Sequence, residues 1–371
     1  MSKKIEFINL KKKYGEINAL NNINYFINER EFFVIFGPSG AGKTTTLKII
    51  AGLELPSSGG INIDNKPTAS MSPKDRNVRM VFENYALYPH LTVFENIASP
   101  LRANRFSKKD ISGKVNSIAS TLGIREYLGR LPRELSGGQK QRVSLGRALV
   151  IKSDIYLLDE PLAHLDAKIR NELRAEFQNI KSFLSKSTVI YVTHDYLEAL
   201  ALGERICVMD KGEVIQIGNP EEIYYYPVNT FVAQTVGQPE ISLLNLDISY
   251  KNGFYFLTNH NIDIKLSKRF NNLLKRYNKN KIIFGCRPQF WDFSKQEVKE
   301  NDGYLKTEVQ AFEIRNFKGV ILTRVNSEQI IILCKSFEEI KEKEALWVKP
   351  DEERIYLFDV DTGDNLLLKN I

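Results

Sequence analysis

A glycine-rich segment near the N-terminus carries residue types that can hold a polyphosphate. It reads Gly37-Pro38-Ser39-Gly40-Ala41-Gly42-Lys43-Thr44, and it lies between a strand-like apolar run and a helix-like one. Glycines let backbone N–H groups turn toward phosphate oxygens, and the start of the following helix presents further unpaired donors. We therefore expect a nucleotide site here, with Thr45 included, in which Lys43 reaches the β- and γ-phosphates and the Thr44 hydroxyl holds Mg²⁺.

Two adjacent carboxylates end another apolar run, Ile155-Tyr156-Leu157-Leu158-Asp159-Glu160. In a nucleotide-binding fold, Asp159 is expected to hold Mg²⁺, mostly through water, and Glu160 to orient the water that attacks the γ-phosphate. An apolar strand that ends in acids is common, so this pattern alone is a weak signal. Combined with Lys43 in one α/β domain, it becomes a strong indication of ATP hydrolysis.

A second glycine pair lies in Leu135-Ser136-Gly137-Gly138-Gln139, just before a segment predicted to be helical over 139–150. The start of a helix leaves backbone donors unpaired and carries a partial positive charge, so it attracts anions. One chain thus offers two phosphate-binding segments.

The elements that must position these groups alternate between strand-like and helix-like patterns. Buried strands are predicted at 31–36, 155–158, 189–192 and 205–209, with mostly helical segments over 84–150. Beyond residue 240 the pattern changes to short strands at 254–257, 281–284, 304–310, 320–325, 329–333 and 354–358. We therefore predict an α/β nucleotide-binding domain at 1–240 with a helical subdomain at about 84–150, and a mostly β domain at 241–371.

Composition excludes several classes of protein. With 371 residues, 43% of them hydrophobic and 26% charged, the chain is expected to fold into two or three soluble domains. It contains no run of 18 apolar residues and no signal-peptide pattern, and its three cysteines form no CxxC pair, so we expect neither a membrane span nor a zinc or disulfide scaffold. The net charge of +7 is concentrated in the basic segment 267–281, whose apolar stripe predicts an amphipathic helix with a solvated face rather than a nucleic-acid patch.

Taken together, these motifs resemble the ATP-binding subunit of an ATP-binding cassette (ABC) transporter. In that family, the segment matching 135–139 closes over ATP held by the segment matching 37–44 of another subunit, which implies a head-to-tail dimer. The resemblance also implies a role for Tyr14, in KKKYG, as the aromatic residue that stacks on adenine. Asp166, in PLAHLDA, matches the loop that crosses the dimer interface, although the family usually has Ser where Ala163 stands. His194, in YVTHD, matches the histidine that contacts the γ-phosphate.

One position departs from the family pattern. In MVFENYALYPHLTV, the family usually has Gln where Glu83 stands. In the family, the amide oxygen of that glutamine touches Mg²⁺ and the attacking water. A carboxylate is a stronger ligand for magnesium, but it lacks the two amide donors and adds negative charge beside Asp159 and Glu160. Three hypotheses remain: Glu83 is tolerated with altered coupling, the chain is the weaker half of a heterodimer, or Glu83 lies in a surface ion pair without catalytic role.

The segments ALYPHLTVFENI, PEEIYYYPVNTFVA and ERIYLFDVDTGDNL resemble the maltose and glycerol-3-phosphate importer branch, whose ATPase subunits end in a regulatory domain of oligosaccharide-binding-fold type. An iron, sulfate or polyamine importer remains an alternative, as does, in another class, a soluble ABC ATPase that acts on nucleic acid or ribosomes. The implied partners are a second ATPase subunit, two transmembrane permease subunits and, indirectly, an extracytoplasmic solute-binding protein, with no nucleic acid. The implied location is peripheral, on the cytoplasmic face of the cell membrane.

Overall fold

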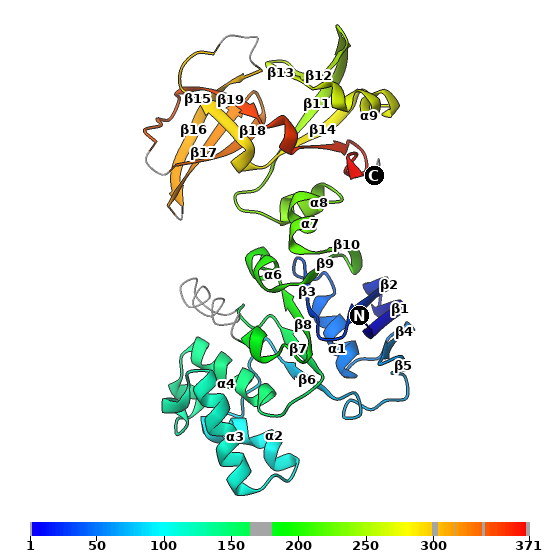
Figure 1. Ribbon diagram of the computed structural model, residues 1–371, viewed down its shortest axis with the longest axis vertical. Coiled ribbons are helices and arrows are strands. Elements are labelled where there is room, and N and C mark those ends of the chain that lie inside the picture. Colours follow the sequence, from blue (N-terminus) through cyan, green and yellow to red (C-terminus); the bar gives the residue numbers. More distant parts are fainter. Residues whose placement is uncertain (1, 164–179, 299–302, 316, 336–337, 369–371) are drawn as a thin grey trace. The chain divides into compact units, whose positions relative to one another are not determined.

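The structure is a computed structural model that describes residues 2–163, 180–298, 303–315, 317–335 and 338–368. The chain divides into two compact units, Met1–Glu221 and Glu222–Ile371, called here the N-terminal and the C-terminal unit. Each unit has its own sheets and its own buried apolar cluster (Figure 1).

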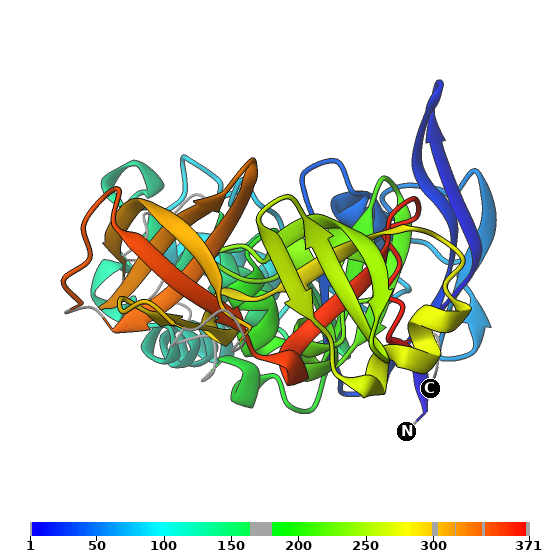
Figure 2. The same cartoon turned by 90° about the horizontal axis from the view of Figure 1, so that it is seen from above.

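The N-terminal unit contains two sheets, with strand orders β2-β1-β4-β5 and β10-β9-β3-β8-β7-β6. The first is antiparallel, and its long β1–β2 hairpin extends as a twisted ribbon (Figure 2). In the second, strands β9, β3, β8, β7 and β6 run parallel, and β10 pairs antiparallel with β9. The strands are β1 Lys3–Tyr14, β2 Ile17–Asn28, β3 Phe32–Phe36, β4 Ser58–Ile63, β5 Lys66–Pro67, β6 Val78–Val81, β7 Ile155–Asp159, β8 Thr188–Thr193, β9 Arg205–Asp210 and β10 Glu213–Gly218.

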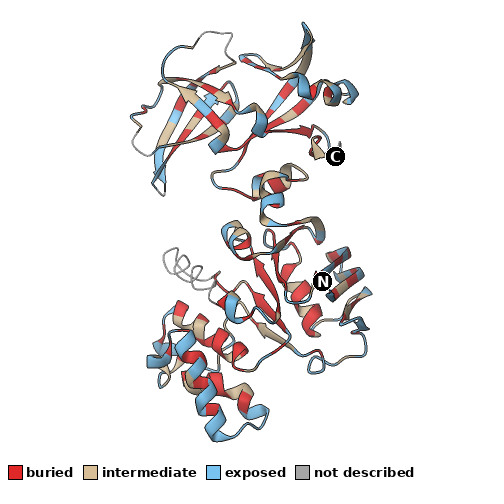
Figure 3. Ribbon diagram, in the orientation of Figure 1, coloured by how far each residue is buried: buried red, intermediate tan, exposed pale blue. Residues whose placement is uncertain are grey.

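Helix α1 (Lys43–Ala51) joins these two sheets through a shared core. Its buried Leu47 and Ile50 belong to one cluster with Phe7 of β1 and Leu157 of β7. Strands β3, β7 and β8 are buried along their whole length, as expected for parallel strands covered on both faces (Figure 3). This packing places the start of α1 just beyond the end of β3.

Residues 93–149 form a helical region with α2 (Val93–Ala103), α3 (Lys108–Thr121) and α4 (Gly137–Leu149), and with short 3-10 turns at Arg125–Tyr127 and Pro132–Glu134. Each of the three helices starts at a hydroxyl side chain, Thr92, Ser107 or Ser136, which accepts a hydrogen bond from a backbone N–H of the first turn. Helix α6 (Tyr196–Leu202) follows β8 and is capped in the same way by Asp195.

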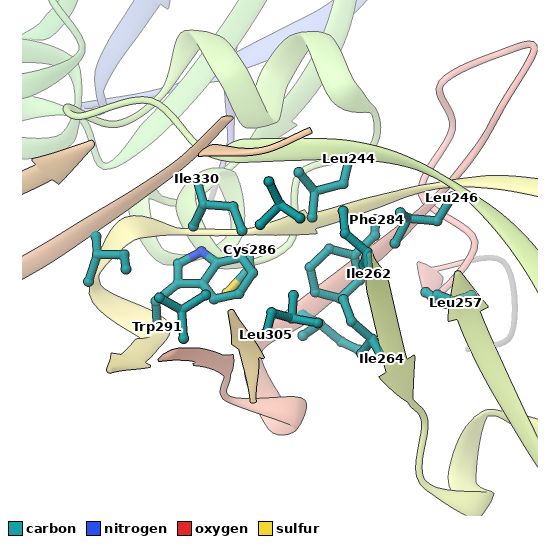
Figure 4. Packing of buried hydrophobic residues seen from close by; sticks show 14 of the residues in the cluster. Leu244, Leu246, Leu257, Ile262, Ile264, Phe284, Cys286, Trp291, Leu305 and Ile330 are labelled. Carbon is teal, nitrogen blue, oxygen red and sulfur yellow. The ribbon is translucent and has the colours of Figure 1, made fainter. Parts of the chain in front are cut away.

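The C-terminal unit is mostly β. Its sheets have the orders β13-β12-β11-β14-β20 and β15-β19-β16-β17-β18. Leu244, Phe284 and Trp291 lie in its apolar core (Figure 4). The elements are α7 Pro220–Tyr225, which begins at the boundary, α8 Thr230–Thr235, β11 Ser242–Lys251, β12 Phe254–Asn259, β13 Ile262–Lys265, α9 Asn271–Arg276, β14 Lys281–Cys286, β15 Trp291–Ser294, β16 Leu305–Arg315, β17 Lys318–Val325, β18 Glu328–Lys335, β19 Ala345–Pro350 and β20 Ile355–Asp359, with 3-10 turns at Lys268–Phe270, Pro288–Phe290 and Glu352–Arg354.

The predicted fold class, an α/β unit followed by a mostly β unit, is confirmed. The helix predicted over the basic segment 267–281 is shorter than its apolar stripe suggests, because it consists of one 3-10 turn and α9, which ends at Arg276. Among the described helices, none is long and apolar enough to cross a membrane.

Candidate functional site

Several of the predicted site residues follow the carboxyl ends of the parallel strands. Phe36 of β3 pairs with Thr193 of β8, and Asp159 of β7 pairs with Val192, so these strands end side by side. Strand β6 ends beside β7 in the same direction. Gly37, Glu83, Glu160 and His194 therefore all follow carboxyl ends of neighbouring parallel strands, which is where open α/β sheets bind ligands.

The glycine-rich segment is built by close backbone approaches. Gly42 has φ 97°, and a Cβ at this position would lie 2.5 Å from the carbonyl oxygen of Ala19, so only glycine fits. Gly40 also adopts the left-handed region, with φ 81°. Lys43 is 4% exposed, and its ammonium donates to the carbonyl oxygens of Gly37 at 2.9 Å and Pro38 at 3.0 Å. The lysine thus folds over the turn in which phosphates are expected.

Thr44 and Asp159 are in direct contact. The Thr44 hydroxyl donates to Oδ1 of Asp159 at 2.9 Å. Burial raises the pKa of Asp159 to about 6; the Thr44 hydrogen bond opposes this shift, and the charges of Glu160 and Glu83 add to it. A carboxylate in such a site gains from a cation, which would offset both its burial and its negative neighbours.

Glu160 connects the lysine to the histidine. Its carboxylate lies 3.3 Å from the Lys43 ammonium and 2.6 Å from Nδ1 of His194. The Glu160 backbone adopts a left-handed conformation, φ 43°, and its N–H donates to the carbonyl oxygen of Val192. The side chain of Glu160 is 14% exposed and that of His194 is 47% exposed, so this pair lies where the site opens to solvent.

Glu83 follows β6, and its charge is one of the causes that raise the pKa of Asp159. The segment after it is held by side chains that the sequence interpretation missed. Ser144 of α4 donates to the carbonyl oxygen of Tyr85 at 2.8 Å, and Arg147 donates to those of Ala86 at 2.6 Å and Tyr85 at 3.3 Å. Tyr85 and Ala86 both have left-handed backbones, φ 60° and 47°.

Asn96 of α2, fully buried, holds the next part of this segment. Its amide accepts from the Tyr88 N–H and donates to the carbonyl oxygens of Tyr88, Leu91 and Thr92. An asparagine within a helical pattern gives no signal for such a role. A fully buried amide is explained only when its backbone partners are known.

The remaining predicted residues lie elsewhere. Ser136 and Gln139 form a capping box at the start of α4, with Gly137 and Gly138 in its first turn. In Figure 1, α4 and α1 are drawn apart, with strands of the parallel sheet between them. Tyr14 ends β1 on the other sheet, with 42% of its surface exposed. Asp166 lies outside the described residues.

Comparisons with known proteins agree with this geometry. The profile of the ABC transporter family matches residues 20–163. The chain is 39% identical over 368 residues to the trehalose/maltose import ATP-binding protein MalK of Thermococcus litoralis, covering 97% of this chain and 98% of that protein. It is 38% identical to the oligosaccharides import ATP-binding protein MsmX of Bacillus subtilis, covering 93% and 94%. It is 47% identical over 243 residues to the sn-glycerol-3-phosphate import ATP-binding protein UgpC 2 of Rhizobium johnstonii, covering 66% and 70%.

Solved structures give the same result for more than half of the chain. The cbiO1 protein of Clostridium perfringens, part of the ABC transporter complex cbiONQ, matches with a TM-score of 0.55 at 28% identity, over 60% of this chain and 91% of that one. The ATP-binding cassette MJ0796, in a dimeric post-hydrolysis state bound to ADP and Pi, matches with a TM-score of 0.53 at 33% identity, over 58% and 98%. Together with the convergence of Lys43, Asp159, Glu160 and His194, these relatives show that the chain belongs to the ATP-binding proteins of the ABC transporter family.

Proposed function

We propose that this chain is the ATP-hydrolysing subunit of an importer for carbohydrates or glycerol-phosphate-like solutes. The observation that carries the proposal is the contact chain from Lys43 through Glu160 to His194, next to the Thr44–Asp159 pair. It places a cation, a base and a hydrogen-bonding imidazole around one point, which suits phosphoryl transfer to water. The solute class follows from the relatives, which are import ATP-binding proteins for maltose, oligosaccharides and glycerol phosphate.

In this proposal, residues 37–45 bind the triphosphate, with Lys43 exchanging its carbonyl partners for β- and γ-phosphate oxygens. Glu160 accepts a proton from the attacking water, and His194 orients Glu160 and the γ-phosphate. Tyr14 stacks on adenine from the edge of the other sheet. In the second copy, Ser136, Gly137, Gly138, Gln139 and Asp166 complete the site of the first.

The site fits a magnesium ion. The hard oxygen donors Thr44 Oγ1 and Asp159 Oδ1 lie 2.9 Å apart, and negative charge surrounds them. Among the described residues no group of three or more His, Cys, Asp or Glu side chains forms a metal site, so we expect the phosphates to supply further ligands. When bound, Mg²⁺ neutralises phosphate charge. Glu83 is the third proposed protein ligand, because it follows the end of β6, next to the strand that carries Asp159.

Glu83 follows the end of β6, which pairs with the strand that carries Asp159, and its charge helps to raise the pKa of Asp159; this favours the two hypotheses in which Glu83 belongs to the site. In the first, Glu83 is tolerated and the homodimer hydrolyses ATP with altered coupling. In the second, the chain is the less active half of a heterodimer.

A groove lies beside the segment that contains Glu83, and a permease subunit is its proposed partner. The groove has a volume of about 380 Å³, and Phe82, Tyr88, Pro100 and Arg147 contribute to its lining. Its apolar and aromatic walls suit a short helix of a transmembrane subunit.

A permease partner implies that the protein lies at the cytoplasmic face of the membrane. The proposed domains are a nucleotide-binding domain at 1–240 and a regulatory domain at 241–371.

The deciding experiment measures Mg²⁺-dependent ATP turnover by the purified chain beside the variants Glu83→Gln and Glu160→Gln. We expect wild-type turnover, a loss of about 10² to 10⁴ in Glu160→Gln with ATP binding retained, and a change of only a few-fold in Glu83→Gln. If wild type turns over no faster than Glu160→Gln and Glu83→Gln restores activity, the heterodimer hypothesis is correct. Unchanged turnover in Glu160→Gln contradicts the proposed mechanism.

A further inference from the structure

A buried carboxylate lies directly behind the strand end that carries His194. Glu198, in the first turn of α6, is 3% exposed. Its Oε2 accepts hydrogen bonds from the Tyr191 hydroxyl and from the Thr193 hydroxyl, each at 2.8 Å. Burial of a carboxylate is costly without such donors, so the two hydroxyls and the carboxylate hold one another in place.

The Thr193 hydroxyl has a second partner. Its oxygen accepts from the backbone N–H of Asp195 at 3.0 Å. A hydroxyl carries a single hydrogen, and because Glu198 takes that hydrogen, a lone pair of the oxygen faces the Asp195 N–H. Thr193 and Asp195 are the two chain neighbours of His194, so the backbone on both sides of the histidine is held by one buried group.

The side chain of Asp195 strengthens this arrangement. Its Oδ1 accepts from the N–H groups of Leu197 at 2.8 Å and Glu198 at 3.3 Å, which caps α6 and fixes the helix that carries Glu198. By contrast, the side chain of His194 is 47% exposed. The position of its imidazole therefore depends on the backbone that carries it, as well as on its contact with Glu160.

We propose that Glu198 and Thr193 are positioning residues for His194. The carboxylate of Glu198 orients the Thr193 hydroxyl, and that hydroxyl holds the backbone that presents Nδ1 of His194 to Glu160 at 2.6 Å. The inference rests on the proposed function, in which His194 and Glu160 act on the γ-phosphate. Its consequence is that turnover depends on two residues that touch neither nucleotide nor water.

The test replaces Thr193 by Val, which has the same shape but no hydroxyl. We expect kcat for ATP to fall about 10- to 100-fold with little change in KM, because a small misplacement of a catalytic group has effects of this size. Thr193→Ser, which keeps the hydroxyl, should restore most of the activity. The matched control is Thr188→Val, at the other end of β8: Thr188 is also buried, and its hydroxyl also accepts a backbone N–H, from Arg30. Thr188→Val should lower stability similarly and leave kcat within a few-fold.

Variants of Glu198 separate its acceptor role from its charge. Because both hydroxyls donate to the same oxygen, Glu198→Gln retains an acceptor and should remain close to wild type. Glu198→Met removes the acceptor and should lose as much kcat as Thr193→Val. Equal losses in Thr193→Val and Thr188→Val would reduce the role to folding and overturn the inference.

A double-mutant cycle distinguishes failure of this inference from failure of the proposed function. If His194→Ala leaves turnover unchanged, the proposed role of His194 is wrong. If His194→Ala lowers turnover, Thr193→Val should add little to that loss, because residues that act through one group are not additive. Full additivity of the two variants shows that Thr193 does not act through His194.

Discussion

Two buried cationic side chains, Lys43 in the N-terminal unit and Arg287 in the C-terminal unit, are used differently. Lys43 in the N-terminal unit is 4% exposed and Arg287 in the C-terminal unit is 1% exposed. Both donate to backbone carbonyls. Lys43 bonds to those of Gly37 and Pro38, and Arg287 bonds to those of Tyr224 and Val236, both at 2.6 Å.

The difference lies in what else surrounds each cation. Lys43 also lies 3.3 Å from Glu160, and in the proposed function phosphate oxygens replace its present partners. Arg287 stacks on the ring of Tyr224 at 4.0 Å, and its acceptors lie at the ends of α7 and α8, where carbonyls lack helical partners. Its planar fork fits several fixed acceptors at once. In the proposed function Lys43 is thus a buried cation that exchanges its partners, whereas Arg287 is structural.

The largest expected effect comes from Lys43→Met. Removal of the ammonium should lower ATP turnover by at least about 10²-fold, because a positioned charge that stabilises the transition state contributes this much or more. The thermal stability of the nucleotide-free protein should fall less than in Arg287→Met, because Lys43 donates to two carbonyls, whereas Arg287 donates to three and also stacks on a ring. Turnover assays and thermal unfolding without nucleotide measure both. A large loss of stability would make Lys43 structural and remove the contrast with Arg287.

Arg287→Met should give the opposite result. Several carbonyls lose their donor at once, so we expect the C-terminal unit to lose about 2–4 kcal/mol of stability while ATP turnover stays within a few-fold. Both tryptophans, Trp291 and Trp347, lie in this unit, so fluorescence during urea unfolding reports on it selectively. Arg287→Lys keeps the charge but loses the fork, and an intermediate stability is expected. A loss of turnover as large as that of Lys43→Met would contradict the division of roles.

Arg147 is an intermediate case. It is half-buried, which lowers the pKa of its guanidinium, and it donates to two consecutive carbonyls in the segment that follows Glu83. Arg147→Lys removes the two-pronged contact, so we expect turnover to fall about 10-fold through misplacement of Glu83, with a smaller loss of stability than in Arg287→Met. The same assays decide this. A loss of stability without a loss of turnover would group Arg147 with Arg287.

The motifs around Lys43 could be predicted from the sequence because a few adjacent residues determine the local backbone and the ligand chemistry together. Strand ends at Asp159 and His194 followed from short apolar runs. The supports of these residues could not be predicted, because Ser144, Arg147 and Glu198 act through contacts that only the folded chain creates. Tyr85 and Ala86 have left-handed backbones that their residue types do not suggest. Likewise, the sequence does not show that Arg287 donates to the carbonyls of Tyr224 and Val236.

The smallest expected effect, on stability, concerns Asp359 of the C-terminal unit. Its pKa shifts in the direction opposite to that of Asp159 in the N-terminal unit. Burial raises the pKa of Asp159 to about 6, whereas the Lys279 ammonium, together with the N–H groups of Thr362 and Asp361, holds the pKa of Asp359 well below its usual value. The charged form of Asp359 is thus favoured by folding. Its contribution to stability is present above the usual aspartate pKa of about 3.9 and is lost as the pH falls below it.

Asp359→Asn should therefore lower the urea midpoint of the C-terminal unit modestly at pH 7, and the difference from wild type should shrink below about pH 4, where the native carboxylate also begins to lose its advantage. Tryptophan fluorescence measures both curves. The matched control is Asp361→Asn: Asp361 also contacts Lys279, at 2.6 Å, but its side chain is 71% exposed, so solvent screens the pair and little change is expected. If Asp359→Asn lowers the urea midpoint equally at pH 7 and pH 3, the prediction is wrong. The hydrogen bonds of Asp359 to Asp361 and Thr362, rather than its charge, then stabilise the C-terminal unit.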